Sequence, residues 1–93
     1  MPPDPPGSAF PHDLLLTASY DDHDRARTVE RSLRQEVGEI DDDRSRTALS
    51  RDGAGLAIRI AAADLVALRA ASNTWLSLLS VAERATAIGN GPD

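Results

Sequence analysis

Asp21, Asp22 and Asp24, with His23 between them, form the densest group of possible metal ligands or acid–base groups in the sequence. Carboxylates and an imidazole placed this closely could hold a cation or transfer a proton. However, aspartate is also favoured at the start of a helix, where its carboxylate accepts hydrogen bonds from free backbone N–H groups. This capping role already accounts for the cluster. A small hydrolase or metal enzyme that uses Asp21, Asp22 and His23 is therefore kept only as an alternative.

The other motifs do not assemble an active site. His12 and His23 lack the spacing of a zinc site, and the chain has no cysteine. The run Asp41-Asp42-Asp43 lacks the spaced ligands and the glutamate of a calcium loop. Gly53-Ala54-Gly55 is expected to join two strands rather than a strand and a helix, unlike a phosphate-binding loop. We therefore expect no catalytic residues, no metal and no cofactor.

The charge composition is unusual. All ten basic residues are arginine, eleven of the fifteen acidic residues are aspartate, and the net charge is −5. Carboxylates hold water and counterions at a protein surface, so the composition favours a cytoplasm of high salt concentration, although a coding bias alone would also produce it. The uninterrupted apolar runs are far shorter than the ~20 residues that span a bilayer, and no signal sequence is recognised. We expect a cytoplasmic protein without membrane contact.

The 93 residues suffice for one small domain and not for two. Five of the six prolines lie within residues 1–11, which predicts a disordered, Pro-rich tail. Residues 89–93 are typical of a helix stop followed by a frayed C-terminus. A single α+β domain is therefore expected over residues 12–88.

Hydrophobic patterning within that domain predicts the element order β-α-β-β-α. The predicted elements are a strand over 13–20, a helix from the acidic cluster to about Val37, strands over 44–52 and 56–62, and a helix from Leu65 to about Ala87. The first helix is a crossover, and the last two strands form a hairpin. With the apolar third strand in the middle, the result is a two-layer fold: a three-stranded antiparallel sheet of order 2-3-1 with two helices on one face.

Two features of this fold favour a protein partner. The first strand is apolar, lies at a sheet edge and lacks an internal proline or charge to protect it, so another chain could pair there. The apolar arc of the second helix is wider than the ~100° that a surface helix needs, which favours burial against another protein over a wholly internal core. This arc consists of Leu68, Ala71, Trp75, Leu78, Leu79 and Ala82, with Leu65 and Leu76 on one flank and Val81 and Ala85 on the other.

The arginines supply two further candidate contacts. Arg27, Arg31 and Arg34 share one ridge of the first helix, where they could contact phosphates or an acidic partner. A solvated face with a Glu30–Arg34 pair is the simpler interpretation. Arg59 is expected on the sheet face without helices, among small residues that suit close packing of a second subunit or a polyanion; plain solvent exposure is equally compatible.

The run from Ala62 to Leu76, with the pattern A.D...LRAA.N.WL, is the most specific part of a family resemblance. Together with the strand and acidic helix over 14–37, the Arg44-Ser45 strand entry and the segment LAIRIAAAD, it resembles the small dimerising subunit of the KEOPS complex, the CTAG/Pcc family. The resemblance covers about residues 12–86. The acidic, lysine-free composition is similar to that of members from halophilic archaea.

The resemblance implies a non-catalytic scaffold. KEOPS installs the threonylcarbamoyl group on the adenosine that follows the anticodon in ANN-decoding tRNAs, and an ATP-dependent transferase subunit performs that chemistry. Members of the family form homodimers, pack two helices against two helices of the transferase subunit, and contribute to tRNA binding. A stand-alone RNA-binding module is the alternative, but the acidity and the 3% aromatic content disfavour it.

By matching position, the resemblance implies two groups of contact residues. The transferase contact falls on Val29, Leu33, Leu68, Ala71, Trp75, Leu79 and Ala82, which overlap the expected core. The tRNA or dimer contacts fall on Tyr20, Arg27, Arg31, Arg59 and Arg69. Because the chain is acidic, any tRNA contact is expected to be weak or to require the whole complex.

Overall fold

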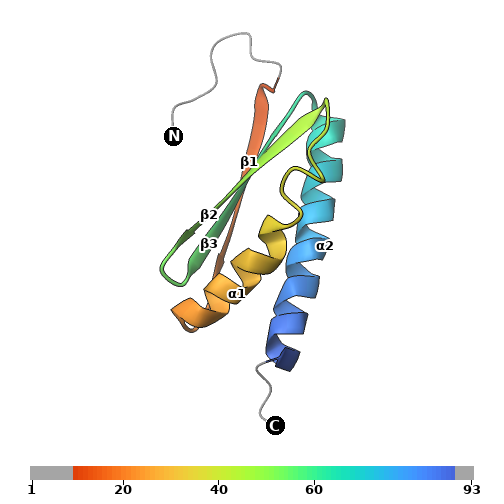
Figure 1. Ribbon diagram of the computed structural model, residues 1–93. Coiled ribbons are helices and arrows are strands. Elements are labelled where there is room, and N and C mark those ends of the chain that lie inside the picture. The colour runs from red at the N-terminus through yellow and green to blue at the C-terminus, as the bar shows by residue number, and fades with distance from the viewer. Residues whose placement is uncertain (1–9, 90–93) are drawn as a thin grey trace.

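The computed structural model describes residues 10–89 (Figure 1). The elements are β1 (His12–Ser19), α1 (His23–Arg34), β2 (Ser45–Asp52), β3 (Gly55–Ala62) and α2 (Leu65–Gly89). This order confirms the predicted β-α-β-β-α arrangement. Most of the tail predicted for residues 1–11, and residues 90–93 of the predicted frayed end, lie outside the described residues.

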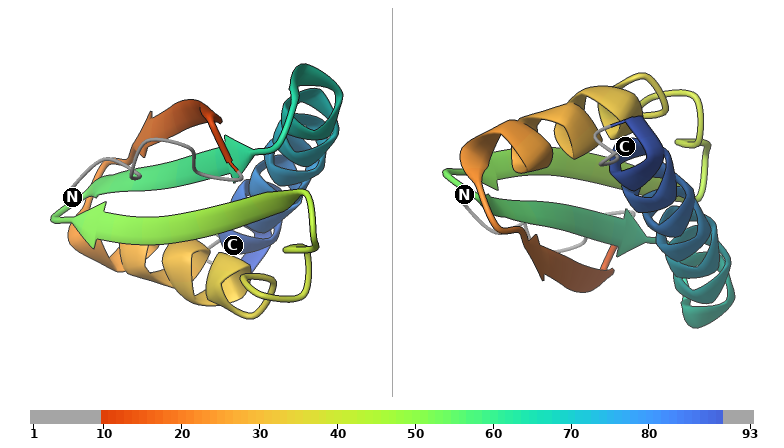
Figure 2. Two further views of the ribbon diagram at one scale, coloured as in Figure 1. Left: turned by 90° about the horizontal axis from the view of Figure 1, so that it is seen from above. Right: turned by 90° about the horizontal axis from the view of Figure 1, so that it is seen from below.

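The three strands form one sheet in the order β1-β3-β2, and both neighbouring pairs are antiparallel, which confirms the predicted 2-3-1 order. Both helices cover the same side of the sheet (Figure 2). We call the other side the open face. It consists of the outward-facing residues of the three strands: Asp13, Leu15, Thr17, Ser19, Arg46, Ala48, Ser50, Asp52, Ala57, Arg59 and Ala61.

The central strand β3 holds the sheet against the helices, because every second side chain along it is buried in the core. Leu56, Ile58 and Ile60 point toward the helices and are buried. Asp52 pairs with Gly55 at the end of the hairpin, which leaves a two-residue turn. Gly53 opens this turn with a φ of +61°, a left-handed conformation that glycine adopts without the usual side-chain clash.

Helix α1 starts where its acidic residues predict and ends earlier than expected. The Asp22 carboxylate accepts a hydrogen bond from the backbone N–H of Arg25 at 2.8 Å, which confirms the capping role. The predicted end at Val37 is wrong, because the helix gives way to tighter turns after Arg34. The N–H of Glu36 bonds to the carbonyl of Leu33, and Gly38 reverses the chain with a φ of +92°.

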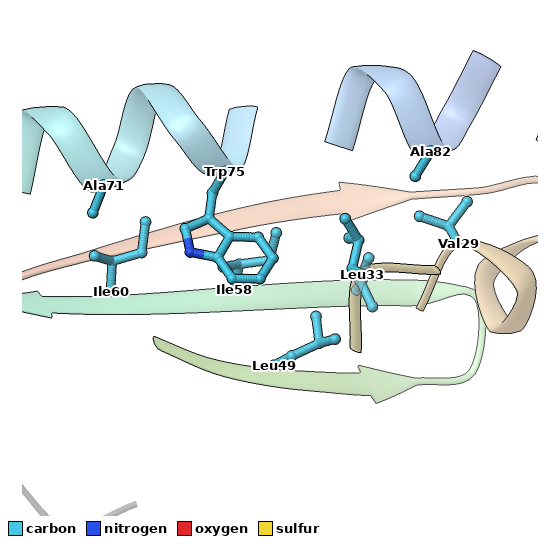
Figure 3. Packing of buried hydrophobic residues seen from close by; sticks show 9 residues of the cluster. Val29, Leu33, Leu49, Ile58, Ile60, Ala71, Trp75 and Ala82 are labelled. Carbon is cyan, nitrogen blue, oxygen red and sulfur yellow. The ribbon is translucent and has the colours of Figure 1, made fainter. Parts of the chain in front are cut away.

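Helix α2 is fixed to the sheet by Trp75. The Asp64 carboxylate accepts a hydrogen bond from the N–H of Ala67 at 2.8 Å and caps the helix. The Trp75 side chain is wholly buried beside Ile58 (Figure 3), and its indole N–H donates to the Thr47 hydroxyl of β2 at 2.9 Å. This contact satisfies the one polar group that the indole brings into the core.

We expect Thr47→Val to lower the free energy of unfolding by about 1–3 kcal/mol, because it leaves the buried indole N–H without an acceptor. Urea unfolding followed by tryptophan fluorescence measures the change. Thr28→Val, at an exposed position of α1, is the matched control and should change stability by about 0.5 kcal/mol or less. An equal loss in both variants would contradict the role of the hydrogen bond.

Candidate partner-binding surfaces

The structure places most of the residues predicted to contact a transferase inside the domain itself. Five of the seven are buried in the core: Val29, Leu33, Ala71, Trp75 and Ala82. Leu68 and Leu79 are half-buried and pack against that core. A partner that docks on the intact domain therefore meets other residues of the helices first, and among the seven only Leu68 and Leu79 remain within its reach.

Four large apolar side chains of α2 are exposed instead. The exposed fractions are 64% for Leu65, 79% for Val66, 49% for Leu76 and 58% for Val81. Burying this much apolar surface is favourable at roughly 25 cal/mol per Å², so a helix that exposes it has a strong tendency to acquire a partner.

These exposed residues lie on two sides of α2. Leu65 and Leu76 share a ridge with Glu83, whose carboxylate accepts from the Tyr20 hydroxyl next to β1 at 2.6 Å. We call this the β1-side ridge. Val66 and Val81 lie on a second ridge, together with Ala70 and Thr74, which we call the outer ridge.

The outer ridge borders a groove of about 290 Å³ between α2 and the loop that precedes β2. Val66, Ala67, Ala70 and Thr74 line its helix side, while the loop contributes Ile40, Asp42, Arg44 and Ser45. The loop wall is well ordered by hydrogen bonds, because the Asp42 carboxylate accepts from the backbone N–H groups of Arg44 and Ser45. The Arg44 guanidinium also pairs with the Asp64 carboxylate at the start of α2.

Helix α2 is more apolar over its whole length than the short apolar runs of the sequence indicate. Among the described residues, the segment Leu65–Thr86 is long and apolar enough to cross a bilayer by length and composition, with a mean hydropathy of 1.3. A core helix passes the same test, and α2 supplies Trp75, Ala71 and Ala82 to the core. Only 17% of that segment is buried, however, so the helix retains apolar surface beyond the needs of this domain.

Strand β1 is an edge strand with apolar side chains on both faces. Leu14 points toward the helices yet is 37% exposed, and Leu15 on the open face is 59% exposed. The strand pairs with β3 on one side and lies at the end of the sheet on the other. Its outward N–H and C=O groups are therefore available to another strand.

Tyr20 links the three elements that meet at the end of β1. Its hydroxyl donates to Glu83, and the Arg25 guanidinium lies 5.6 Å from its ring centroid. Burial and the neighbouring Glu83 carboxylate raise the pKa of the Tyr20 phenol, so it stays protonated as a donor. This position gives Tyr20 a structural task besides any role in a dimer or tRNA contact.

Arg27, Arg31 and Arg34 share one ridge of α1, and two of these arginines form ion pairs with acidic residues of the same helix. Arg27 lies 3.5 Å from Asp24, and Arg34 donates to Glu30 at 2.6 Å, as the simpler interpretation predicted. Glu30 also accepts from Arg51 of β2 at 2.9 Å, which ties α1 to the hairpin. Arg31 on this ridge and Arg69 on α2 are exposed.

Asp22 and His23, from the acidic cluster before α1, have local structural roles. Asp22 caps the helix, and the His23 ring lies against the hairpin turn, so a Cβ at Gly53 would meet its Nε2 at 3.4 Å. Among residues 10–89, no group of three or more histidine and acidic side chains is placed to hold a metal ion.

The open face carries two arginines, Arg46 and Arg59, and only Arg59 was predicted to lie there. Arg59 lies among small residues as predicted, and its guanidinium pairs with the Asp13 carboxylate at 2.7 Å. Arg46 was not singled out, although its alternation with Ala48 along β2 would have placed it on the same face. Its guanidinium lies 4.8 Å from the ring centroid of Phe10.

Comparisons with known proteins agree on one family. A family model described as "Transcription factor Pcc1" matches residues 14–87. No curated protein gives a significant match to the sequence. Among solved structures, a chain of the crystal structure of the binary complex Gon7-Pcc1 superposes with a TM-score of 0.73 at 13% identity, over 85% of this chain and 96% of that one. At this identity the structural likeness supports the fold.

The two arginines around Glu30 predict a pH dependence. Hydrogen bonds from Arg34 and then Arg51 lower the pKa of the Glu30 carboxyl below its ordinary 4.5. The resulting stabilisation is fully present above the unfolded-state pKa of about 4.5 and is lost as the pH falls through the lower folded-state pKa. Glu30→Gln should therefore be less stable than the wild type at pH 7, and thermal melts should show the difference shrinking below pH 4.5. A constant difference down to pH 2 would contradict this assignment.

Proposed function

The chain belongs to the Pcc1 family, whose members are non-catalytic subunits of KEOPS, and we propose that it is the dimerising scaffold that recruits the transferase subunit of this complex. In this role it supports threonylcarbamoyl modification of the adenosine that follows the anticodon in ANN-decoding tRNAs, while the transferase performs the chemistry. The observation that carries the proposal is the exposed apolar surface of α2 beside an unpaired sheet edge.

The β1 edge and the β1-side ridge support docking of a second copy. Edge-to-edge pairing of two β1 strands would satisfy their outward backbone groups and extend the sheet from three strands to six. Because α2 overhangs the sheet on the same side, that pairing would also bring Leu76 and Leu65 of the two copies toward each other. One contact would thus bury backbone and apolar side chains together.

A solved structure with this fold contains two different proteins. The chain that superposes on this one belongs to the binary complex Gon7-Pcc1. We take this as support for a protein partner on this fold.

The outer ridge supports docking of the transferase. Val66 and Val81 are exposed over about four turns of α2, and Ala70 and Thr74 between them are small enough for another helix to approach closely. Leu68 and Leu79, from the set implied by the family resemblance, pack against the core on the side of the β1-side ridge and do not extend the outer ridge. The dimer and transferase contacts then use opposite sides of one helix, so one copy can hold both.

We further propose that the protein acts in the cytoplasm of an organism with a high internal salt concentration. The support is its net charge of −5 with arginine as the only basic residue type. Under such conditions apolar contacts keep their strength, whereas exposed ion pairs are screened. A scaffold in that solvent is best assembled through apolar ridges like those of α2.

The first expected outcome concerns the dimer. Leu76→Glu places a charge on the β1-side ridge, and burying that charge against its symmetry mate should weaken dimerisation at least about tenfold. Light scattering at high salt should give the mass of two chains for the wild type and a shift toward one chain for the variant. A wild-type chain that is strictly monomeric at high concentration would overturn the dimer proposal.

The second expected outcome concerns the transferase. Val81→Glu should reduce capture of the transferase subunit about tenfold and leave the dimer mass unchanged, because Val81 lies on the outer ridge. Leu76→Glu is the matched control, since it puts the same charge on the other side of the same helix. If Leu76→Glu abolishes transferase capture while Val81→Glu does not, the assignment of the two ridges is reversed.

A further inference from the structure

Strand β2 forms the second edge of the sheet, and its outward backbone groups can be identified from the hairpin. In an antiparallel pair, residues whose N–H and C=O groups bond to the neighbouring strand alternate with residues whose groups point away from it. Asp52 and Gly55 flank the two-residue turn and form a bonded pair, which fixes this alternation along the hairpin. The outward backbone groups of β2 therefore belong to Ser45, Thr47, Leu49 and Arg51.

The same alternation shows that the β1 edge is uncovered. The backbone groups of Leu56 and Ile58 point away from β2 and toward β1, so their partners in β1 bond inward. The outward groups of β1 are then those of Asp13, Leu15, Thr17 and Ser19. Among residues 10–89, no other group bonds to these backbone N–H and C=O groups.

The start of the β2 edge, in contrast, is occupied by the loop that precedes the strand. The backbone N–H of Ser45 donates to the Asp42 carboxylate at 3.0 Å, and the Ser45 carbonyl accepts from the backbone N–H of Asp42 at 3.1 Å. Both outward groups of Ser45 are therefore used within the chain. A strand from another molecule could pair with β2 only beyond this residue.

The middle of the β2 edge is covered by a side chain of α1, the helix that runs beside this strand (Figure 2). The Arg34 guanidinium lies 3.5 Å from the carbonyl oxygen of Leu49, which is one of the outward groups. A hydrogen bond of this length is weak, so it adds little to stability. Its effect on access is larger, because the guanidinium occupies the position that the N–H of an incoming strand would need.

Glu30 holds Arg34 in this position. The Glu30 carboxylate accepts from Arg34 at 2.6 Å and from Arg51 of β2 at 2.9 Å, so one acidic side chain joins two arginines. The Glu30 side chain is 18% exposed, whereas that of Arg34 is 54% exposed. Arg34 thus combines a fixed base with a solvated charge at the strand edge, and charged side chains in this position keep edge strands from pairing.

An open β2 edge would change how copies of this chain assemble. A contact between two β1 edges is self-complementary and ends at two copies. If the β2 edges could also pair, each dimer would add another dimer at both ends, and the sheet would grow without limit. A scaffold of defined size therefore requires that one of the two edges stays closed.

We propose that Arg34, positioned by Glu30, keeps the β2 edge closed to a second copy of this chain, so that strand pairing is confined to β1. The number of copies in the assembly rests on the proposed β1 dimer. The closure of β2 rests only on contacts within one chain. Arg34 determines which edge is used, although it belongs to α1 and lies outside both ridges of α2.

Light scattering of the full chain over a range of concentrations at high salt tests the proposal. Arg34→Ala removes the guanidinium from the β2 edge, and the mass of this variant should rise with concentration from two chains to about four or more. The wild type should stay at two chains. An Arg34→Ala variant that also stays at two chains at every concentration would overturn the inference.

The matched control is Arg31→Ala, which removes the same charge from an exposed position of α1. Within residues 10–89 the Arg31 side chain makes no hydrogen bond or ion pair, so this variant should stay at two chains. Equal growth of both variants would assign the effect to the lost charge and would contradict the closure by Arg34.

Amide hydrogen exchange identifies the surface through which Arg34→Ala grows. In the larger species, the outward N–H groups of Thr47, Leu49 and Arg51 should exchange at least about tenfold more slowly than in the wild type, because an incoming strand bonds to them. Larger species in which these three amides exchange at the wild-type rate would grow through another surface, and the inference would then be wrong.

Leu76→Glu separates this inference from the proposed dimer. In that background the β1 dimer is weakened, so the addition of Arg34→Ala should raise the mass from one chain toward two through β2. If the wild type is a monomer but Arg34→Ala forms a dimer with protected β2 amides, the closure of β2 stands and the β1 dimer is wrong. A wild type of two chains with an unaffected Arg34→Ala removes only the closure.

Discussion

Trp75 anchors α2 across the sheet, and most other features of the surface follow from that contact. The indole fills the space above Ile58, and its N–H can reach Thr47 only if the helix keeps one rotation about its own axis (Figure 3). With the rotation fixed, Leu65 and Leu76 must face the β1 side and Val66 and Val81 must face away. One buried side chain thus determines which apolar residues of α2 remain exposed.

The dimensions of the two layers explain why so much apolar surface is left. Three strands about 4.8 Å apart give a sheet only about 10 Å wide between its outer strands, whereas two packed helices need about 20 Å. The helices therefore overhang the sheet, and α2 overhangs it on the side of β1 (Figure 2). Tyr20 and Glu83 close the far end of this overhang, while Leu14, Leu65 and Leu76 remain in contact with solvent.

Local patterns in the sequence were sufficient for most of the fold. The aspartates that cap the helices, the alternation of Leu56, Ile58 and Ile60, and the glycine turn each act over a few residues, so their outcome could be predicted. Val37 misled the prediction for the end of α1 because it continues the apolar stripe; it packs against the core from a turn instead of from the helix. Periodicity describes which residues are buried, but it does not distinguish a helical turn from a tighter one.

The candidate surfaces were less predictable for a different reason. The wide apolar arc of α2 predicts apolar contacts on more than one side of the helix, but the arc does not say which part faces its own sheet. Ala71, Trp75 and Ala82 turned out to face inward, and the division between two ridges depends on the Tyr20–Glu83 contact, whose members are far apart in the chain. The same holds for Phe10 and Arg46, which meet only because the sheet places β1 and β2 on either side of β3.

The strand order also bears on how the domain folds. Strands β2 and β3 are joined by a two-residue turn and can pair early, whereas β1 reaches its place beside β3 only after a helix and another strand have been positioned. Contacts between segments this far apart form late, because closing the intervening chain costs entropy. The last strand to join the sheet is thus also one of its two edges. Completion of the monomer and recognition of a second chain would use opposite edges of this one strand, so the second contact would have to wait for the first.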